Sequence, residues 1–267
     1  MTARMIVWTL STLLALGLTL GASGLARGEE IKIGVLAPLT GPASSWGEYT
    51  RDAAELAMAE INATGGVTGV GPMKLIYEDS EGNPKAGVTA VTKLVDRHKV
   101  HVVLGEALSS VTLPAMAVTQ RAQIPQLTPI SGSPDITASG NKWIFRTQIN
   151  QKYSGDLLAE WAVKRLGFKE IAIMHANEPF GAGGANSFRD SLAARGVKPA
   201  AFERFNRDDK DFSGQLRTIK ASGAKLLGFG RKAEERVDLP FGEKRHWFDG
   251  WAGDPVDAAG EHARLVL

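Results

Sequence analysis

The stretch IKIGVLAPLTGPASSWGEYTRDAAELAMAEINATGG, residues 31–66, decides the fold class of this chain. Ile31–Leu36 is a compact apolar run that predicts a strand, and residues 41–47 predict a loop. Residues 49–62 predict a helix that ends at a glycine pair, because apolar residues recur there at helical spacing, namely Ala53, Leu56, Ala57 and Ile61. A strand followed by such a helix is the first half of a βαβ unit.

The same alternation of strand and helix continues to residue 229. Further strands are predicted at residues 74–77, 100–104, 126–128, 143–146, 170–174, 200–205 and 224–229. Further helices are predicted at residues 84–96, 112–122, 153–166, 185–195 and 212–221. The alternation predicts an α/β fold with parallel sheets. Because the rhythm restarts after residues 143–146, we expect two lobes, residues 29–148 and 149–230, with a crevice between the carboxyl ends of their strands.

The N-terminal residues 1–28 are typical of a Sec-type signal peptide. Arg4 supplies the positive region, Met5–Leu20 the apolar region, and small residues precede a cleavage point expected between Ala26 and Glu29. A membrane anchor is the alternative, but the apolar run is shorter than the roughly 20 residues of a bilayer span. The sequence has no cysteine that a lipid could modify. We therefore expect a periplasmic protein without a lipid anchor.

Composition and motifs argue against nucleic-acid binding and catalysis. The 267 residues carry a net charge of +2 without a long basic run, so nucleic acid is not an expected partner. The sequence contains no Gly-x-Ser-x-Gly elbow, His-Glu-x-x-His motif, Walker loop or cysteine-based metal site. His98 and His101 are interpreted as surface or satisfied residues, and His175 lacks a nucleophile to activate. We predict no catalytic residue, no cofactor and no metal.

Two loops of the first lobe carry the first candidate ligand-binding residues. Trp46 lies in the loop after the first strand, where it covers a ligand or packs the loop onto the lobe. Ser109 and Ser110 stand at the start of a helix that follows a strand. Backbone N–H groups and hydroxyls at such a helix start form an anion site, although simple helix capping explains the serines equally well.

Two further loops complete the candidate site. Residues 128–135 offer hydroxyls and carbonyls suited to an ammonium group, or form a simple cluster of turns; Ile130, Ser131 and Gly132 are the candidates there. In the second lobe Phe180 lies in the loop after a strand, from which its ring can close over a ligand.

Several of these motifs resemble one protein family in unbroken order over about residues 30–230. They are PLTG (38–41), EINATGG (60–66), SSVT (109–112), FRT (145–147) and PFG (179–181). At these spacings the sequence resembles the branched-chain amino-acid-binding proteins, the Leu/Ile/Val-binding class of periplasmic receptors. The resemblance implies a two-lobed type I Venus-flytrap fold that binds a small molecule without catalysis. It also implies that the ligand passes to an inner-membrane ABC permease.

The resemblance assigns roles to individual residues. Ser109 matches a serine that bonds the ligand carboxylate, Trp46 a pocket tryptophan, and Ile130 a residue whose carbonyl receives the ammonium group. Gly132 stands where the family has a threonine, so Ser131 or Ser133 would have to replace the lost hydroxyl. Phe180 stands in place of a tyrosine and lacks its phenol. An amino acid of the branched-chain type, or a similar small polar solute, is therefore the expected ligand.

The C-terminal residues 231–267 form an aberrant tail with no apolar period and no counterpart in the family. A truncated or frameshifted reading frame near residue 230 is the favoured explanation, and a divergent extension is the alternative. An incomplete second lobe would bind its ligand weakly. Two other functions stay open: a sensing receptor for amides or urea-like solutes, and a periplasmic enzyme on the same fold. We expect a monomer.

Overall fold

A five-stranded parallel sheet forms the core of the first lobe in the computed structural model, which describes residues 30–207, 209–230 and 263–266. The strands are β1 (Ile31–Ala37), β2 (Met73–Asp79), β3 (Val102–Gly105), β4 (Gln126–Thr128) and β5 (Ile144–Arg146). Their order in the sheet is β2-β1-β3-β4-β5, and every neighbouring pair is parallel. All five strands therefore end at the same edge of the sheet.

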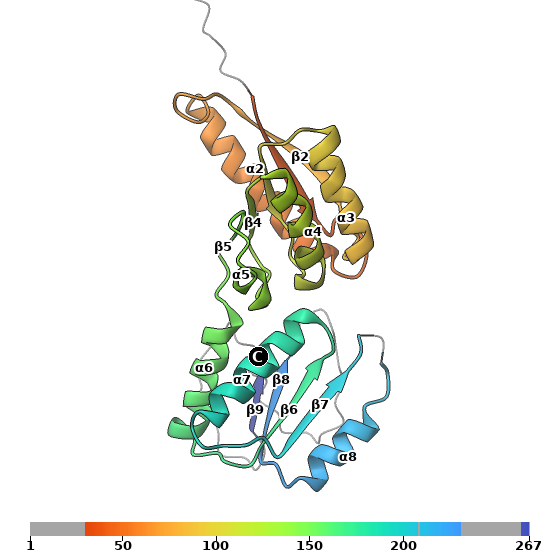
Figure 1. The fold of residues 1–267 in the computed structure, drawn as a ribbon, viewed down its shortest axis with the longest axis vertical. Helices are drawn as coiled ribbons and strands as arrows, with labels where there is room; N and C mark the ends of the chain where they lie inside the picture. The colour runs from red at the N-terminus through yellow and green to blue at the C-terminus, as the bar shows by residue number, and fades with distance from the viewer. Residues whose placement is uncertain (1–29, 208, 231–262, 267) are drawn as a thin grey trace, which may run out of the picture.

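Helices cover both faces of this sheet, as its parallel strands require (Figure 1). They are α2 (Ser44–Ala63), α3 (Pro84–Thr92) with its π-helical continuation η1 (Lys93–Arg97), α4 (Ser109–Ala122) and the short α5 (Asp135–Ala138). Leu36 and Val103 pack against α3, η1 and α4 on one face, and Val35 packs with Ala54 of α2 on the other.

Helix α2 differs from its prediction in both its start and its buried face. It begins at Ser44, five residues before the predicted start, and its buried residues are Gly47, Thr50 and Ala54. Leu56, which belonged to the predicted apolar stripe, is 64% exposed. A Cβ at Gly47 would lie 2.2 Å from the carbonyl oxygen of Pro38, so the helix approaches the chain too closely there for a larger side chain.

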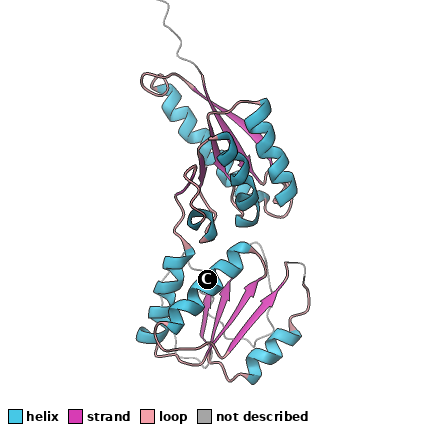
Figure 2. Ribbon diagram, viewed as in Figure 1, coloured by secondary structure: helices cyan, strands magenta, loops and turns pink. Residues whose placement is uncertain are grey.

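The second lobe is a four-stranded parallel sheet with helices on both faces. Its elements are α6 (Gln151–Glu160) with η2 (Trp161–Arg165), β6 (Ile171–Ala176), α7 (Pro179–Ala193), β7 (Ala201–Phe205), α8 (Ser213–Ala221), β8 (Leu226–Gly230) and β9 (Ala263–Val266). The strand order is β7-β6-β8-β9. Figure 2 shows the strands of this sheet pointing toward the first lobe. The expected α/β fold of two lobes with parallel sheets is confirmed.

Strand β6 is buried along its whole length and separates two apolar clusters. Ile171 and Ile173 face α6 and α7, where Phe188 is fully buried. Met174 faces α8 on the other side of the sheet. Alternate side chains of one strand thus supply both layers of the lobe.

Several expectations concern residues at the chain ends. The signal peptide at residues 1–28 lies outside the described residues, as do positions 231–262 and 267 of the predicted tail. The described residues 263–266 form β9, which pairs in parallel with β8. The predicted boundary between residues 148 and 149 falls in the connection between β5 and α6.

Candidate functional site

The candidate loops meet where the two lobes touch. Because the strands of each sheet are parallel, the loops after β3 and β4 leave the same edge of the first sheet, and the loop after β6 faces them from the second lobe (Figure 1). Helices α4 and α7 contact each other across this boundary. The site is therefore described from the start of α4, through the loop after β4, to the start of α7.

Ser109 is the first residue of α4 and is fully buried. Its Oγ accepts a hydrogen bond of 3.2 Å from the N–H of Ser133. The hydroxyl keeps its own hydrogen, which it can donate to a ligand oxygen. The capping alternative is wrong, because Leu108 occupies the N-cap position and no side chain caps this helix. Ser110 is the next residue of the helix and is partly exposed.

Ser131 faces the interior of the first lobe. Its Oγ donates to the carbonyl oxygen of Glu106 at 2.9 Å and lies 2.7 Å from the Oγ1 of Thr112. Its N–H donates to the Oγ1 of Thr128 at 3.2 Å. The hydroxyl of Ser131 thus already has partners within the lobe.

The partly buried guanidinium of Arg146 holds the loop that contains Ser131 and Ser133. Its Nη2 donates to the carbonyl oxygen of Ser133 at 2.9 Å and to the Oγ1 of Thr137 at 2.8 Å. Its Nη1 donates to the carbonyl oxygen of Ser131 at 3.4 Å. Burial lowers the pKa of this guanidinium. These hydrogen bonds tie the loop after β4 to the end of β5.

Gly132 and Phe180 bring the two lobes together. A Cβ placed on Gly132 would lie 3.0 Å from Cε2 of Phe180, so the aromatic ring rests against the glycine backbone. Phe180 is the second residue of α7, whose N-cap is Glu178. The carboxyl group of Glu178 accepts hydrogen bonds from the N–H groups of Phe180 and Gly181 at 3.1 and 2.6 Å. Ile130 is partly buried just before this contact.

Trp46 requires a correction. The sequence predicts a loop at this position, but α2 begins at Ser44 and the tryptophan lies in its first turn. Its ring packs on Ala43, Leu108 and Val111. The packing alternative therefore accounts for its position, since it holds the start of α2 against the start of α4.

The sequence motifs do not predict Gln151, which lies at this boundary, or Glu106, which lies inside the first lobe beside the candidate loops. Gln151, the first residue of α6, donates its N–H to the carbonyl oxygen of Gly132 at 3.2 Å. Glu106 is fully buried, and its carboxyl group accepts from the Oγ of Ser80 at 3.0 Å and the N–H of Leu108 at 2.6 Å. No periodicity or motif identifies Gln151; only its neighbours in space do.

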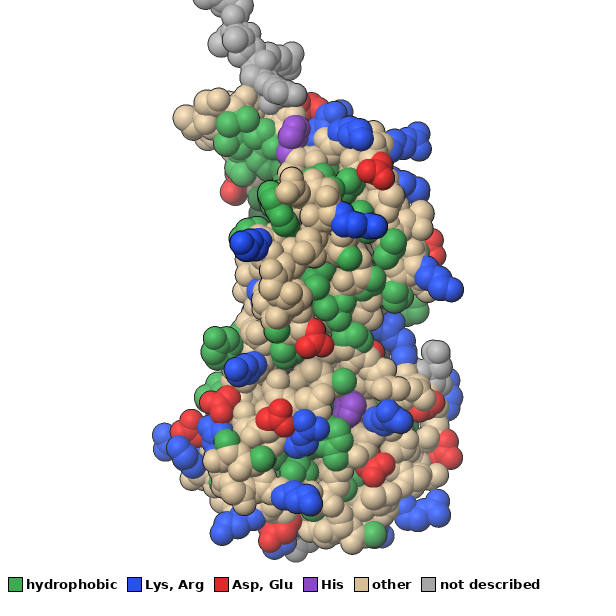
Figure 3. Space-filling model, in the orientation of Figure 1, with side chains coloured by type: hydrophobic (Ala, Val, Ile, Leu, Met, Phe, Trp, Pro, Cys, Tyr) green, Lys and Arg blue, Asp and Glu red, His purple; other side chains and the backbone are tan. Residues whose placement is uncertain are grey.

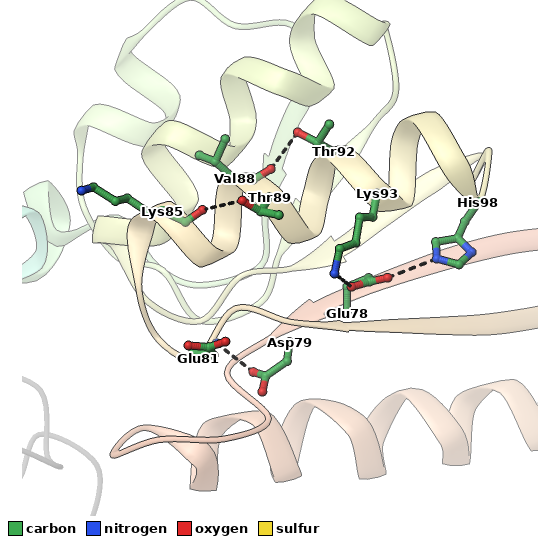
Figure 4. A network of polar contacts seen from close by, with 9 residues as sticks. All are labelled: Glu78, Asp79, Glu81, Lys85, Val88, Thr89, Thr92, Lys93 and His98. Carbon is green, nitrogen blue, oxygen red and sulfur yellow. Dashed lines mark hydrogen bonds and ion pairs between the residues drawn. The ribbon is translucent and has the colours of Figure 1, made fainter.

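The end of β2 fixes the loop that leads into α2. Asp79 accepts hydrogen bonds from Leu39, Thr40 and Glu81. Burial alone would raise the pKa of this carboxyl group, but the hydrogen bonds outweigh it and hold the pKa below its ordinary value. Figure 4 shows Asp79 turned toward Glu81, and the neighbouring Glu78 between Lys93 and His98.

The histidine interpretation is confirmed for the first lobe. His98 Nε2 lies 3.1 Å from Glu78 Oε1, and His101 Nδ1 accepts from the N–H of Lys32 at 2.9 Å. In the part of the chain that the structure describes, no group of three or more acidic or histidine side chains could hold a metal ion. On the face in Figure 3, positive and negative side chains are interspersed over the second lobe.

Two other surface properties concern the described residues. No helix among them is long and apolar enough to cross a membrane. A surface pocket of about 270 Å³ opens beside the interlobe contact and includes none of the predicted ligand-binding residues. Its lining residues are Pro134, Lys152, Asp156, Ser187, Asp190, Ser191 and Ala194.

Two parallel-sheet lobes that meet at strand-end loops, with buried hydroxyls on one side and an aromatic ring on the other, define the class of two-lobed solute-binding proteins. Residues 30–232 match the model of the family described as periplasmic binding protein, and the chain belongs to this family. Family members are solute-binding proteins.

Individual relatives narrow the comparison. The chain is 31% identical over 216 residues to the "Leu/Ile/Val-binding protein homolog 3" of Brucella melitensis, which covers 81% of this chain and 58% of that protein. It is 35% identical over 201 residues to an "Amino acid binding protein" of Pseudomonas aeruginosa, which covers 75% and 54%. The chain thus spans somewhat more than half the length of these relatives.

Among solved structures, the chain resembles the branched-chain amino acid transporter substrate-binding protein LivJ of Streptococcus pneumoniae in complex with isoleucine. The TM-score is 0.66 at 26% identity, and the match covers 75% of this chain and 57% of that one. The predicted resemblance to branched-chain amino-acid-binding proteins is confirmed.

Proposed function

We propose that this chain holds an amino acid of the branched-chain type between its two lobes as the binding component of an ABC transporter. One observation carries the proposal: the aromatic ring of the second lobe rests against a glycine loop of the first lobe, and a buried serine hydroxyl is hydrogen-bonded to the same loop. They are contributed by Ser109, Gly132 and Phe180. The names of the relatives above, and the isoleucine bound by one similar structure, support the choice of ligand.

The ligand carboxylate is assigned to the start of α4. Ser109 Oγ accepts from Ser133 N–H and has a hydrogen left to donate, and the N-terminus of a helix favours negative charge. Ile130 carbonyl is assigned to the ammonium group. Phe180 covers the ligand from the second lobe, where its ring offers apolar contact but no phenol.

The proposal also states where the chain acts and with which partner. The chain acts in the periplasm as a monomer, passes its ligand to an inner-membrane permease and performs no catalysis. The family match supports a solute-binding role, and binding needs no nucleophile or general base.

Calorimetric titration of the chain with a panel of amino acids, extended to millimolar ligand, tests this function. We expect leucine, isoleucine or valine to bind, and Ser109→Ala to lower the affinity by about 1.5–3 kcal/mol, as for a hydrogen bond to a charged group. Ser222→Ala is the matched control, because the hydroxyl of Ser222 bonds within its own helical turn. Failure of the parent chain to bind any amino acid would refute the proposed function. Equal binding by Ser109→Ala would remove only that residue's role.

A further inference from the structure

Two buried polar atoms at the interlobe contact lack a hydrogen-bond partner among the described residues: the Oγ of Ser133 and the Oε1 of Gln151. Ser133 is 0% exposed and Gln151 is 7% exposed. Buried polar groups in folded proteins are nearly always paired, because an unpaired one loses its hydrogen bonds to water without compensation. Two such acceptors close together therefore point to a ligand whose donor groups bind to them.

Both atoms border the same point on α7. A Cβ placed on Gly183 would lie 3.4 Å from the Oγ of Ser133 and 3.4 Å from the Oε1 of Gln151. A Cβ on the next residue, Gly184, would lie 2.8 Å from the Nε2 of Gln151. The glutamine side chain thus lies along the glycine pair of the second lobe, with its oxygen next to the serine of the first.

Hydrogen bonds hold the backbone of both residues in place. Gln151 is held through its N–H bond to the carbonyl oxygen of Gly132, at 3.2 Å. Ser133 is held on both sides, because its N–H donates to Ser109 Oγ and its carbonyl oxygen accepts from Arg146. None of these bonds uses a side-chain oxygen of Ser133 or Gln151, so both oxygens can accept from a bound molecule.

We propose that Gln151 Oε1 and Ser133 Oγ accept two of the three N–H groups of the ligand's ammonium group, beside the carbonyl of Ile130, and that this pair selects amino acids over acids without an amine. The inference rests on the proposed function of this site. An amide oxygen can only accept, so it complements a donor and not a carboxylate. Ser109, one hydrogen bond from Ser133, serves the carboxylate instead. The two ends of an α-amino acid are thereby separated.

The test compares leucine with its 2-oxo acid, which keeps the carboxylate and side chain but lacks the amine. Calorimetry is carried out on the parent chain, on Gln151→Met, which removes the acceptor at similar volume, and on Gln151→Glu, which keeps it and adds a charge. Gln120→Met, at an exposed position of α4, controls for the exchange itself.

We expect Gln151→Met to weaken leucine binding roughly 10- to 100-fold, the range for losing a hydrogen bond to a charged group, and to leave binding of the 2-oxo acid unchanged. Gln151→Glu should bind leucine at least as tightly as the parent and the 2-oxo acid more weakly. In the absence of ligand, Gln151→Met should unfold at a higher temperature than the parent, because an unpaired buried acceptor is gone. A residue with a purely structural role would lower that temperature.

Ser133→Ala gives a second, independent variant and should also weaken leucine binding selectively. The inference would be overturned if Gln151→Met lowered the affinities for leucine and for the 2-oxo acid equally, or if it left the affinity for leucine unchanged. Either result would leave the proposed function intact. A parent chain that binds the 2-oxo acid as tightly as leucine would refute this inference alone, and one that binds no amino acid would refute both.

Discussion

Replacing Asp79 by asparagine should destabilise the first lobe at neutral pH and have little effect in acid. Asp79 ends β2, and its carboxyl group accepts four hydrogen bonds from the two neighbouring loops. Oδ1 accepts from the N–H groups of Leu39, Thr40 and Glu81 at 2.8, 3.3 and 2.8 Å, and Oδ2 accepts from the hydroxyl of Thr40 at 2.6 Å. The loop from β1 into α2 is thereby tied to the next strand.

The size of the effect follows from these bonds. Asparagine keeps the Oδ1 acceptor, but its amide cannot accept from the hydroxyl of Thr40. Hydrogen bonds to a charged group contribute about 1.5–3 kcal/mol and neutral ones about 0.5–1.5 kcal/mol. Because Asp79 is partly exposed, solvent reduces the gain, and Asp79→Asn should lower the free energy of unfolding by about 1–2 kcal/mol. Asp79→Ala removes all four bonds and should cost about 2–4 kcal/mol.

The pH dependence has a fixed sign. The pKa of Asp79 is lower in the folded chain than the ordinary value of about 3.9 expected in the unfolded chain. The stabilisation from its ionised form is therefore complete above about pH 5 and is lost as the pH falls through the folded pKa. The difference in stability between parent and Asp79→Asn should stay constant from pH 7 to 5 and shrink below about pH 4.

Urea unfolding followed by circular dichroism at pH 7, 5, 4 and 3 measures this difference. Asp96→Asn, at an exposed position of η1, is the control for removing one negative charge from the same lobe. The reasoning fails if Asp79→Asn matches the Asp96 variant at pH 7, or if the difference grows as the pH falls.

Substitutions at three other positions test the core of the second lobe, the cap of α7 and the contact between the lobes. Phe188→Ala should lower the free energy of unfolding of the second lobe by about 3–5 kcal/mol, measured in urea, because its ring is fully buried against β8. A loss below about 1 kcal/mol would mean that this core is not formed. Glu178→Ala should cost about 0.5–2 kcal/mol through loss of the cap of α7, and Glu178→Asp, as the conservative variant, should recover part of it in thermal unfolding. Gly183→Ala should weaken the interlobe contact, because its Cβ would lie 2.7 Å from Pro134 Cδ. Thermal unfolding should show a lower transition temperature, and an unchanged one would contradict the contact.

Much of the secondary structure could be predicted from the sequence because strand and helix periods are local properties. Strand β4 was predicted with its observed bounds, and β1 and β7 within one residue. The starts of α2, α4 and α7 were predicted three to six residues too late. The predictions placed each start where the apolar period became clear. In α7 the structural start is instead set by Glu178, which accepts from the first N–H groups, and by Pro179 at the first helical position.

The candidate site was predicted in part. The positions of Ser109, Gly132 and Phe180 in loops at strand ends predicted them as site residues, the resemblance to a family assigned roles to them, and the structure places the glycine against the phenylalanine ring. The sequence could not show which hydroxyl of the loop after β4 turns inward. Ser131 bonds to Glu106 inside the lobe, whereas Ser133 turns toward α7. Adjacent residues in an irregular loop have no fixed period, so their directions depend on the groups around them.

The sequence by itself determined the α/β alternation, the two lobes and the family. These follow from the order of apolar and polar residues along the chain. Only the tertiary structure brought Gln151 to Ser133 and Gly183, residues that are 18 and 32 positions away from it along the chain. Their meeting depends on how the chain passes from β5 to α6 and how closely α7 approaches the first lobe. A contact between separate elements is fixed by packing of their surfaces, which no local pattern encodes.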